Sequence, residues 1–466
     1  MGALNILFSN IKTFWEQTSG AIAIMFALMV PILIGIAGVS LDYSMAYLVQ
    51  QRLAQALDAA ALAAAASSTD ESAIEQRVQD FFDANYPPEK LGVTYDLDVT
   101  IVGDEVTVSG FARYNTRFLQ VLGIDEVDVD AQTTVVREVQ GIEVVLVMDN
   151  TGSMNTNNNI GALRDAASNF VYIMYGIDTD EGESADPSSL DSMVTRDAEY
   201  IKVGLVPYSS SVNVGPYGFG VDPDGDAYGD VFVNNPHNLQ YTTNYNHNTN
   251  WLGCVLAHDY PDDTVDHEGP WDMYRYCRDE DDDPYCRLNS YGNVSKKPNY
   301  YCPRTPVMPL SSSPTGLKES IDTMYAAGYT YGNYGMVWGG RVISPDFPFE
   351  EGVSWENEYW RKAIVMMTDG VNTMEYYYST YGPTQDHDIT PGDLDNRFAE
   401  VCDDLKEKGV IIYTVTFYSN VSESTKEYYR QCATSEDYYH DAPSQDDLVD
   451  VFETISRELS NLHIKN

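Results

Sequence analysis

Oxygen-bearing side chains follow directly after two apolar runs of this sequence. In the stretch MDNTGSM, residues 148–154, acidic and hydroxyl residues stand at every second position: Asp149, Thr151 and Ser153. Farther along, the run IVMMT is followed by Asp369 and a glycine. Carboxylate and hydroxyl oxygens are hard ligands of the kind that Mg²⁺ prefers. These residues predict a divalent-cation site that leaves one position open for the carboxylate of a bound ligand.

Other interpretations of the same residues are weaker. An acid protease needs Asp directly before Thr-Gly, whereas Asn150 intervenes here and no second Asp-Thr-Gly occurs. Ser153 could cap the next helix, and Asp369 could belong to a plain turn, because Ser, Thr and Asp often accept backbone N–H bonds. A metal-dependent hydrolase needs a general base, and no His accompanies either stretch. The two stretches together favour the metal site.

The elements expected to position these residues alternate between strand and helix from Gly141 onward. EVVLVMD, YIKVGLVPYS, RKAIVMMTDG and GVIIYTVTFY read as buried strands, and helical patterns cover residues 160–176, 313–328, 395–409 and 444–462. This alternation predicts a doubly wound α/β domain with a mainly parallel sheet over residues 139–466. Ligands bind such sheets at the carboxyl ends of the strands. Thr330, in the loop AAGYTYGN before a helix, joins the set as a further hydroxyl ligand.

Residues 215–305 interrupt the alternation. They are rich in Asn, Asp, Tyr, Gly and Pro and contain four of the six cysteines, none of them in a CxxC pair. In an exported protein such cysteines form disulfides, so we expect an ordered insertion that contains disulfides. Its stretch DPDGDAYGD, residues 222–230, resembles a calcium loop. A weak Ca²⁺ site is the most it predicts, because Ala227 and Val233 replace the usual Gly and Glu.

The amino-terminal part predicts a membrane helix. Residues 20–39 carry no charge and include Pro31, and about 20 apolar residues suffice to cross a bilayer. The length favours a retained anchor over a cleaved signal peptide. The helix is expected to continue to about Ser67, and the weak charge bias places the amino terminus inside and the rest outside. Residues 1–67 would therefore form an anchor and extended helix.

A small α+β module is expected at residues 68–138. Residues 71–86 have helical spacing, residues 93–116 alternate as a hairpin, and a further strand follows. The module shows no chemistry of its own. The net charge of the whole chain, −44, excludes nucleic acid as a partner, because phosphate binding needs clustered Lys and Arg.

Two resemblances add to this interpretation. The pattern D-x-T-x-S, a distant Thr and T-D-G are similar to the metal-ion-dependent adhesion site (MIDAS) of von Willebrand factor A domains. The segment SGAIAIMFALMVPILIGIAGVSLDY and the elements WLGC, CPRTPVMPL, WGGRVISP and MTDGVNT resemble those of TadG-like proteins of the Tad (Flp) pilus-assembly system. Met25 stands near the place where related pseudopilin segments carry a Glu.

The resemblances imply a specific function. The metal, Mg²⁺ or Mn²⁺, would be held by Asp149, Thr151, Ser153, Thr330 and Asp369. The chain would be a non-enzymatic, single-pass protein of the bacterial inner membrane, with its carboxyl-terminal domain in the periplasm or outside the cell. That domain would bind an acidic side chain of a pilus or envelope protein. The alternative is a minor pilin-like subunit of the filament.

A disulfide pairing also follows from the family-like elements WLGC and CPRT. They imply a bond between Cys254 and Cys302, and we expect a second between Cys402 and Cys432, which leaves Cys277 with Cys286.

Overall fold

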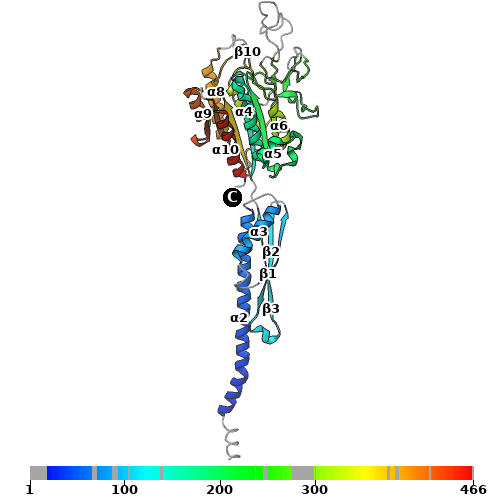
Figure 1. Ribbon diagram of the computed structural model, residues 1–466, viewed down its shortest axis with the longest axis vertical. Coiled ribbons are helices and arrows are strands. Elements are labelled where there is room, and N and C mark those ends of the chain that lie inside the picture. Colours follow the sequence, from blue (N-terminus) through cyan, green and yellow to red (C-terminus); the bar gives the residue numbers. More distant parts are fainter. Residues whose placement is uncertain are drawn as a thin grey trace, which may run out of the picture. The chain divides into compact units, whose positions relative to one another are not determined.

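The computed structural model describes residues 18–65, 71–86, 93–102, 105–136, 140–236, 238–244, 250–267, 269–274, 299, 301–374, 378–383, 388–418 and 421–463. The chain divides into two compact units, residues 1–138 and 139–465, which are described separately (Figure 1).

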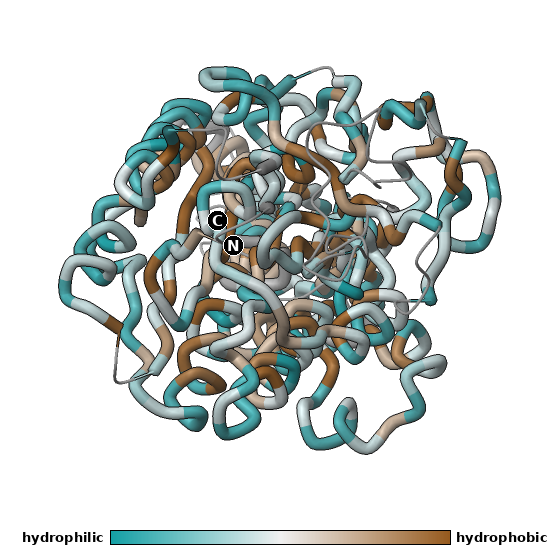
Figure 2. Tube along the Cα trace, turned by 90° about the horizontal axis from the view of Figure 1, so that it is seen from above, coloured by the Kyte–Doolittle hydropathy of each residue, from teal (hydrophilic) through white to brown (hydrophobic). Residues whose placement is uncertain are grey.

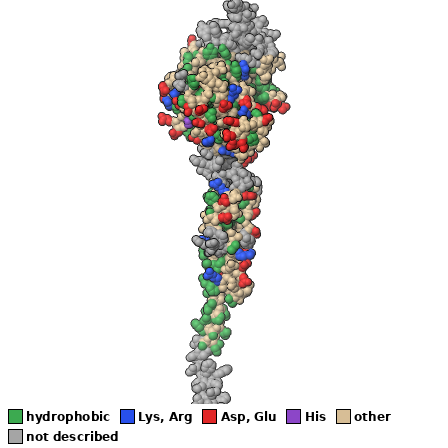
Figure 3. Space-filling view, in the orientation of Figure 1, with side chains coloured by type: hydrophobic (Ala, Val, Ile, Leu, Met, Phe, Trp, Pro, Cys, Tyr) green, Lys and Arg blue, Asp and Glu red, His purple; other side chains and the backbone are tan. Residues whose placement is uncertain are grey.

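A long helix, α2 (Thr18–Ala65), dominates the first unit. Its first half exposes apolar side chains from Ile24 to Leu41, which appear as green patches in Figure 3. Residues 23–63 include a window that is long and apolar enough to cross a membrane, although a signal sequence would meet the same criterion. Pro31 lies inside the helix, as membrane helices tolerate.

The second half of α2 packs on a small α+β layer. Helix α3 (Glu71–Asn85) lies beside it, and three antiparallel strands follow in the order β1 (Val93–Val102), β2 (Glu105–Asn115) and β3 (Glu126–Val136). Alternate residues of β2 point inward, namely Val106, Val108 and Ala112. They meet α2 side chains that recur every three or four positions, namely Val49, Leu53, Leu57 and Ala60. The extended helix and the α+β module therefore share one core.

A six-stranded sheet forms the centre of the second unit. Its order is β8 (Met308–Ser311), β5 (Ile201–Tyr208), β4 (Gly141–Asp149), β9 (Trp360–Thr368), β12 (Ile411–Phe417) and β13 (Tyr439–Ala442). All neighbours are parallel except β8, which is antiparallel to β5. From β4 the chain builds outward through β5 to β8, then returns to add β9 on the other side of β4.

Helices cover both faces of this sheet. Helices α4 (Asn159–Tyr175), α6 (Pro314–Asp322) and α10 (Gln445–His463) pack on one face. Helices α7 (Gly332–Ile343), α8 (Pro391–Glu407) and α9 (Glu423–Cys432) pack on the other. Every residue of β4 is buried, with Val144 facing the first layer and Val145 the second. Hydrophilic stretches of the chain, teal in Figure 2, run along the outer helices.

Short elements complete the second unit. Helix α5 (Thr179–Ser184) follows α4, β6 (Val233–Asn234) pairs with β7 (Trp271–Asp272), and β10 (Tyr378–Ser379) pairs with β11 (Gly382–Pro383). Aromatic residues of the insertion join the core on the second face of the sheet: Phe232 meets Trp271 edge-to-face, and Trp271 packs against Trp338 of α7. Its disulfide joins Cys254 to Cys302, and a second disulfide joins Cys402 to Cys432.

The predicted α/β class, apolar amino-terminal helix and disulfides are confirmed. The Cys277–Cys286 pair lies outside the described residues. The helix expected at residues 313–328 ends earlier, at Asp322, and β8, β13 and α9 were not predicted. Strands β8 and β13 are four residues long and lie at the two edges of the six-stranded sheet. So short a strand carries little of the apolar pattern from which strands are predicted.

At the amino edge of the sheet, a buried carboxylate is paired with lysines. Glu143, near the start of β4, is fully buried and forms an ion pair with the ammonium of Lys362, from β9. Lys202 of β5 lies 3.3 Å from the same carboxylate, and Val353 donates its N–H to it at 2.8 Å. The charge of Glu143 is therefore balanced by groups of the chain itself.

Candidate metal centre at the carboxyl edge of the sheet

Asp149 is the last residue of β4 and is fully buried. Its Oδ1 accepts the backbone N–H of Thr151 at 2.8 Å, because the chain turns back over the carboxylate as the strand ends. Its Oδ2 accepts the hydroxyl of Thr368, the last residue of β9, at 2.8 Å. The phenol of Tyr208, at the end of β5, lies 3.3 Å from Oδ2. Three neighbouring strand ends thus fix one carboxylate.

The hydroxyl groups continue from this carboxylate to the second one. Thr151 Oγ1 and Ser153 Oγ lie 2.9 Å apart, and Ser153 Oγ donates to Asp369 Oδ1 at 2.6 Å. Asp369 directly follows β9. Four of the five predicted ligands therefore lie together at the carboxyl ends of β4 and β9. Ser153 lies inside a short 3₁₀ helix, η2 (Gly152–Asn158), and its hydroxyl is bonded within this cluster instead of capping a helix.

Thr330 lies in a loop that runs beside the same turn. Ala327 donates its N–H to Asn150 O at 2.8 Å, and Gly152 donates its N–H to Gly328 O at 3.0 Å. Thr330 itself is buried, and its N–H bonds to the hydroxyl of Thr373 at 3.0 Å. No hydrogen bond in the described part of the chain joins its side chain to the other four residues. Its role as a ligand, like the roles of the other four residues, stays a prediction.

The spacing of the oxygens fits a small octahedral cation. Neighbouring ligands of Mg²⁺, with bonds of about 2.0–2.1 Å, lie roughly 2.9 Å from each other. The distances from Ser153 Oγ to Thr151 Oγ1 and to Asp369 Oδ1 are 2.9 and 2.6 Å. Each of these oxygens has lone pairs that can turn toward a cation. The donor set consists only of oxygens, which suits Mg²⁺ or Mn²⁺ better than a softer metal.

Electrostatics at this edge differ from those around Glu143. Burial raises the pKa of Asp149 above its usual value, although hydrogen bonds from Thr151 and Thr368 oppose the shift. Burial, together with repulsion from Asp149, raises the pKa of Asp369 to about 7. Within the described ranges, no Lys, Arg or His forms an ion pair with either carboxylate. Their charge must be balanced by protons or by a bound cation.

Other metal sites gain no support. Among the described residues, no group of three or more His, Cys, Asp or Glu side chains could hold a metal ion. The cluster at Asp149 has a different composition, because it combines two carboxylates with hydroxyls. In the stretch proposed as a calcium loop, the carboxylate of Asp222 accepts the N–H groups of Asp224 and Asp226, which shapes a turn.

Sequence reasoning missed the residues that support Asp149. Thr368 stands immediately before Asp369, and its position at a strand end was the available signal. Tyr208 gave no such signal, because a Tyr at a strand end is ordinary. Its phenol also contacts Met367 O at 3.0 Å and so joins β5 to β9 across β4.

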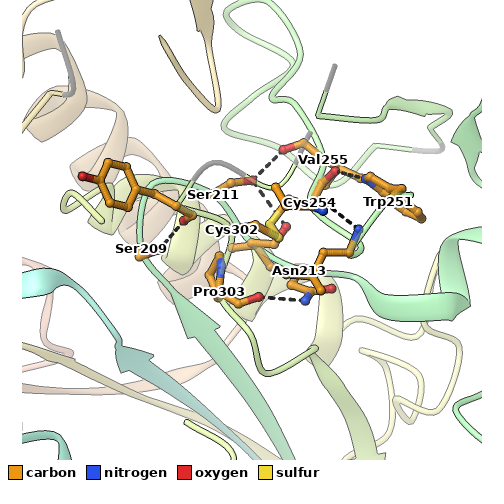
Figure 4. Close-up of a disulfide and its surroundings, with 12 residues drawn as sticks. Ser209, Ser211, Asn213, Trp251, Cys254, Val255, Cys302 and Pro303 are labelled. Atoms are coloured by element: carbon orange, nitrogen blue, oxygen red, sulfur yellow. Dashed lines mark hydrogen bonds between the residues drawn. A yellow bond between two sulfur atoms is a disulfide. The ribbon is translucent and has the colours of Figure 1, made fainter. Parts of the chain in front are cut away.

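The insertion is fastened to the loop that follows β5, close to the Cys254–Cys302 disulfide (Figure 4). Ser211 donates to Val255 O at 2.7 Å, and Asn213 donates to Pro303 O at 2.8 Å. In the same loop, Ser210 Oγ accepts the N–H of Tyr329, beside Thr330, at 2.9 Å. One loop therefore holds both the insertion and the segment that carries Thr330.

Comparisons with solved structures give slight likenesses. The pilus adhesin SpaC of Lactobacillus rhamnosus GG is 13% identical, with a TM-score of 0.36, and the match covers 80% of this chain and 36% of SpaC. The von Willebrand factor domain of the type V pili tip protein Mfa5 from Porphyromonas gingivalis is 11% identical, with a TM-score of 0.35, covering 70% and 97%. Proximal thread matrix protein 1 of the mussel byssus, with a zinc-occupied MIDAS motif, is 13% identical, with a TM-score of 0.32, covering 70% and 47%.

At TM-scores below 0.5 these likenesses establish neither the fold nor the function of the chain, which spans about a third of the length of SpaC. No curated protein matches it. The amino-terminal segment gives a clearer result, which agrees with the resemblance to Tad proteins noted in its sequence. Residues 20–67 match the putative Flp pilus-assembly TadE/G-like family.

Proposed function

We propose that residues 139–466 form a von Willebrand factor A domain, with a doubly wound sheet and a metal-ion-dependent adhesion site. The proposal rests on the position of the oxygen cluster at the carboxyl ends of β4 and β9. Numbered along the chain, the strands of the sheet run 3-2-1-4-5-6. The order reverses between β4 and β9, and ligands bind such sheets beyond the carboxyl ends at that point. Asp149 ends the first of these strands, and Asp369 directly follows the second.

The proposed ligands are Asp149, Thr151, Ser153, Thr330 and Asp369, and the proposed metal is Mg²⁺ or Mn²⁺. The bound cation would act as a Lewis acid that attracts the carboxylate of an acidic side chain on a partner protein. The chain's own residues would hold the cation and fix its open side. Thr368 and Tyr208 would orient Asp149, as residues behind metal ligands commonly do. The role is binding and not catalysis.

The proposed location is the inner membrane of a bacterium, with one membrane-spanning segment and the second unit in the periplasm or outside the cell. The apolar half of α2 and the family match over residues 20–67 support it. Disulfides at Cys254 and Cys402 fit an oxidising compartment. The expected partners are pilus or envelope proteins, and the domain would serve pilus assembly or surface attachment.

Crosslinking in the presence and absence of Mg²⁺ tests this function. The full chain and its Asp149→Ala variant would be crosslinked in their native envelope, with MgCl₂ or with excess EDTA, and the attached proteins identified. Asp165→Ala, an exposed position on α4, is the matched control. Partners should appear only with Mg²⁺ and with an intact Asp149. Partners that persist in both Asp149→Ala and EDTA would rule out the metal-dependent mechanism.

The alternative, a minor pilin-like subunit, rests on the long apolar amino-terminal helix. Fractionation separates the two functions. Sheared pili would contain the chain if it is a filament subunit, and would lack it if it is a membrane-anchored adhesion protein.

A further inference from the structure

The turn between β2 and β3 exposes a group of apolar side chains. It contains a short 3₁₀ helix, η1 (Leu119–Leu122). Val121 is 88% exposed and Leu122 is 67% exposed, while Phe118 and Ile124 are nearly half exposed. We call these four residues the apolar turn. A module with no other partner would gain nothing from placing four large apolar groups together at one tip, so the group indicates an interaction surface.

The apolar turn packs beside the end of the apolar half of α2. Phe118 packs directly over Gly38, where an added Cβ would come within 2.7 Å of Phe118 Cβ. Gly38 is the last residue but one of the uncharged segment 20–39. The turn therefore lies beside the end of the segment that the proposed function places in the bilayer, and it continues the apolar surface of that segment.

Asp42 holds the turn in this position. Its buried carboxylate accepts three successive backbone N–H groups of the turn, from Arg117 at 3.0 Å, Phe118 at 2.7 Å and Leu119 at 2.6 Å. Although burial by itself opposes ionisation, these bonds lower the pKa of Asp42, which stays ionised. A charged group one turn beyond the apolar segment thus fastens the turn to α2.

We infer that the apolar turn docks into the interfacial layer of the membrane that α2 crosses. The inference rests on the proposed anchoring of α2. Lipid is the occupant that the position favours, because the turn adjoins the apolar first half of α2, whose side chains are exposed. Tyr43 and Tyr47 are exposed on α2 just beyond the same level, and tyrosines are enriched where membrane meets water.

Such contact has a consequence for the first unit. A single helix can rotate and tilt in a bilayer, and interfacial anchors limit both motions. With the apolar turn in the interface, the side of α2 that carries Gly38 and Asp42 is fixed relative to the membrane surface. The sheet β1–β3, which packs on the same helix, is fixed with it.

Lipid quenching of a fluorescent probe tests the inference. Single cysteines would be introduced into the full chain at Val121, at Ile32 within the apolar half of α2, and at Val136. Val136 is an exposed valine at the opposite end of β3 and is the matched control. Each would be labelled with an environment-sensitive dye and reconstituted into vesicles of phosphatidylcholine and phosphatidylglycerol. Unsubstituted protein gives the labelling blank, since the described cysteines are paired.

Lipids with a nitroxide near the headgroup should quench the Val121 probe several-fold more than the Val136 probe. Lipids with a nitroxide deep in the acyl chain should quench the Ile32 probe, because Ile32 lies well inside the segment 20–39. Quenching at Ile32 by these lipids without headgroup quenching at Val121 overturns the inference and leaves the anchor intact. Absence of deep quenching at Ile32 overturns the proposed anchoring and the inference with it. A Val121 probe that is shielded from aqueous iodide but not quenched by lipid indicates a protein contact, such as a second copy, and also overturns the inference.

Discussion

Two carboxylates on one strand, Glu143 near the start of β4 and Asp149 at its end, differ in how their charge is balanced. Both are fully buried. Glu143 lies against the ammonium groups of Lys362 and Lys202. Asp149 lies near a second carboxylate, that of Asp369, and receives only neutral donors. The same strand thus carries an internally paired charge at one edge of the sheet and an unpaired one at the other.

The difference separates a structural role from the proposed binding role. A buried charge without a counter-charge is costly, and proteins avoid it unless a proton, a metal or a ligand completes the site. At the amino edge the chain supplies the counter-charge, so nothing from solution is needed. At the carboxyl edge the chain supplies oxygens alone, and a cation from solution would stabilise the arrangement.

The largest effect is expected at the amino edge. Glu143→Ala leaves the buried Lys362 without its carboxylate and should lower the free energy of unfolding of the second unit by about 3–5 kcal/mol. Urea unfolding followed by tryptophan fluorescence measures it, because five of the six Trp residues lie in this unit. The double variant Glu143→Ala/Lys362→Met should recover part of the loss. A single variant as stable as the wild type would contradict the paired-charge account.

The second effect belongs to the carboxyl edge. Mg²⁺ at about 100 times its Kd should raise the free energy of unfolding by about 2.7 kcal/mol, because only the folded site binds it. Asp369→Ala should abolish this increase, whereas Lys202→Met, at the opposite edge, should retain it. Thermal unfolding with and without MgCl₂ gives the comparison. An increase that survives in Asp369→Ala would place the cation elsewhere.

A smaller effect is expected from the group behind the proposed ligands. Thr368→Val keeps the shape of the side chain but removes the hydroxyl that donates to Asp149, and should weaken Mg²⁺ affinity about tenfold. Thr305→Val is the matched control, since Thr305 is also buried and its hydroxyl bonds to that of Thr323, outside the cluster. Calorimetric titration with MgCl₂ should separate the two variants. Equal affinities would mean that Thr368 supports the fold alone.

The smallest effect is expected from neutralising Asp149 in metal-free protein. Asp149→Asn weakens hydrogen bonds worth about 1 kcal/mol but also removes repulsion against Asp369. We therefore expect the free energy of unfolding in EDTA to change by less than about 1 kcal/mol. Glu143→Gln, the same chemical change at the other edge, should be clearly destabilising. Similar losses for both would remove the distinction between the edges.

The sequence predicted the central strands of the second unit because continuous apolar runs such as EVVLVMD are typical of strands buried on both faces of a sheet. It could not predict β8 and β13, since four-residue edge strands carry too short a pattern and are defined by their neighbours. For helix α7, the glycine-rich sequence GNYGMVWGGRVI is unfavourable by propensity, and burial against the sheet outweighs that preference.

Part of the candidate site could be predicted from the sequence, as could part of the fold. Asp149, Thr151 and Ser153 could be grouped because two-residue spacing after a strand brings them into one turn. Asp369 could be added only by assuming that its strand neighbours β4, which the structure shows. Tyr208 could not be found, because its contact with Asp149 depends on the register between two strands. Thr330 lies in the adjacent loop, and its side-chain role stays a prediction.

The position of β4 has a mechanical consequence. The strand begins at Gly141, where the chain arrives from the first unit, and ends at Asp149. Any tension between the preceding chain and a group held at Asp149 runs along this strand, over roughly 30 Å. The load falls in shear on the backbone hydrogen bonds to β5 and β9 on both sides. Bonds loaded in shear share the force, so β4, which is paired along both sides, is well placed to bear it.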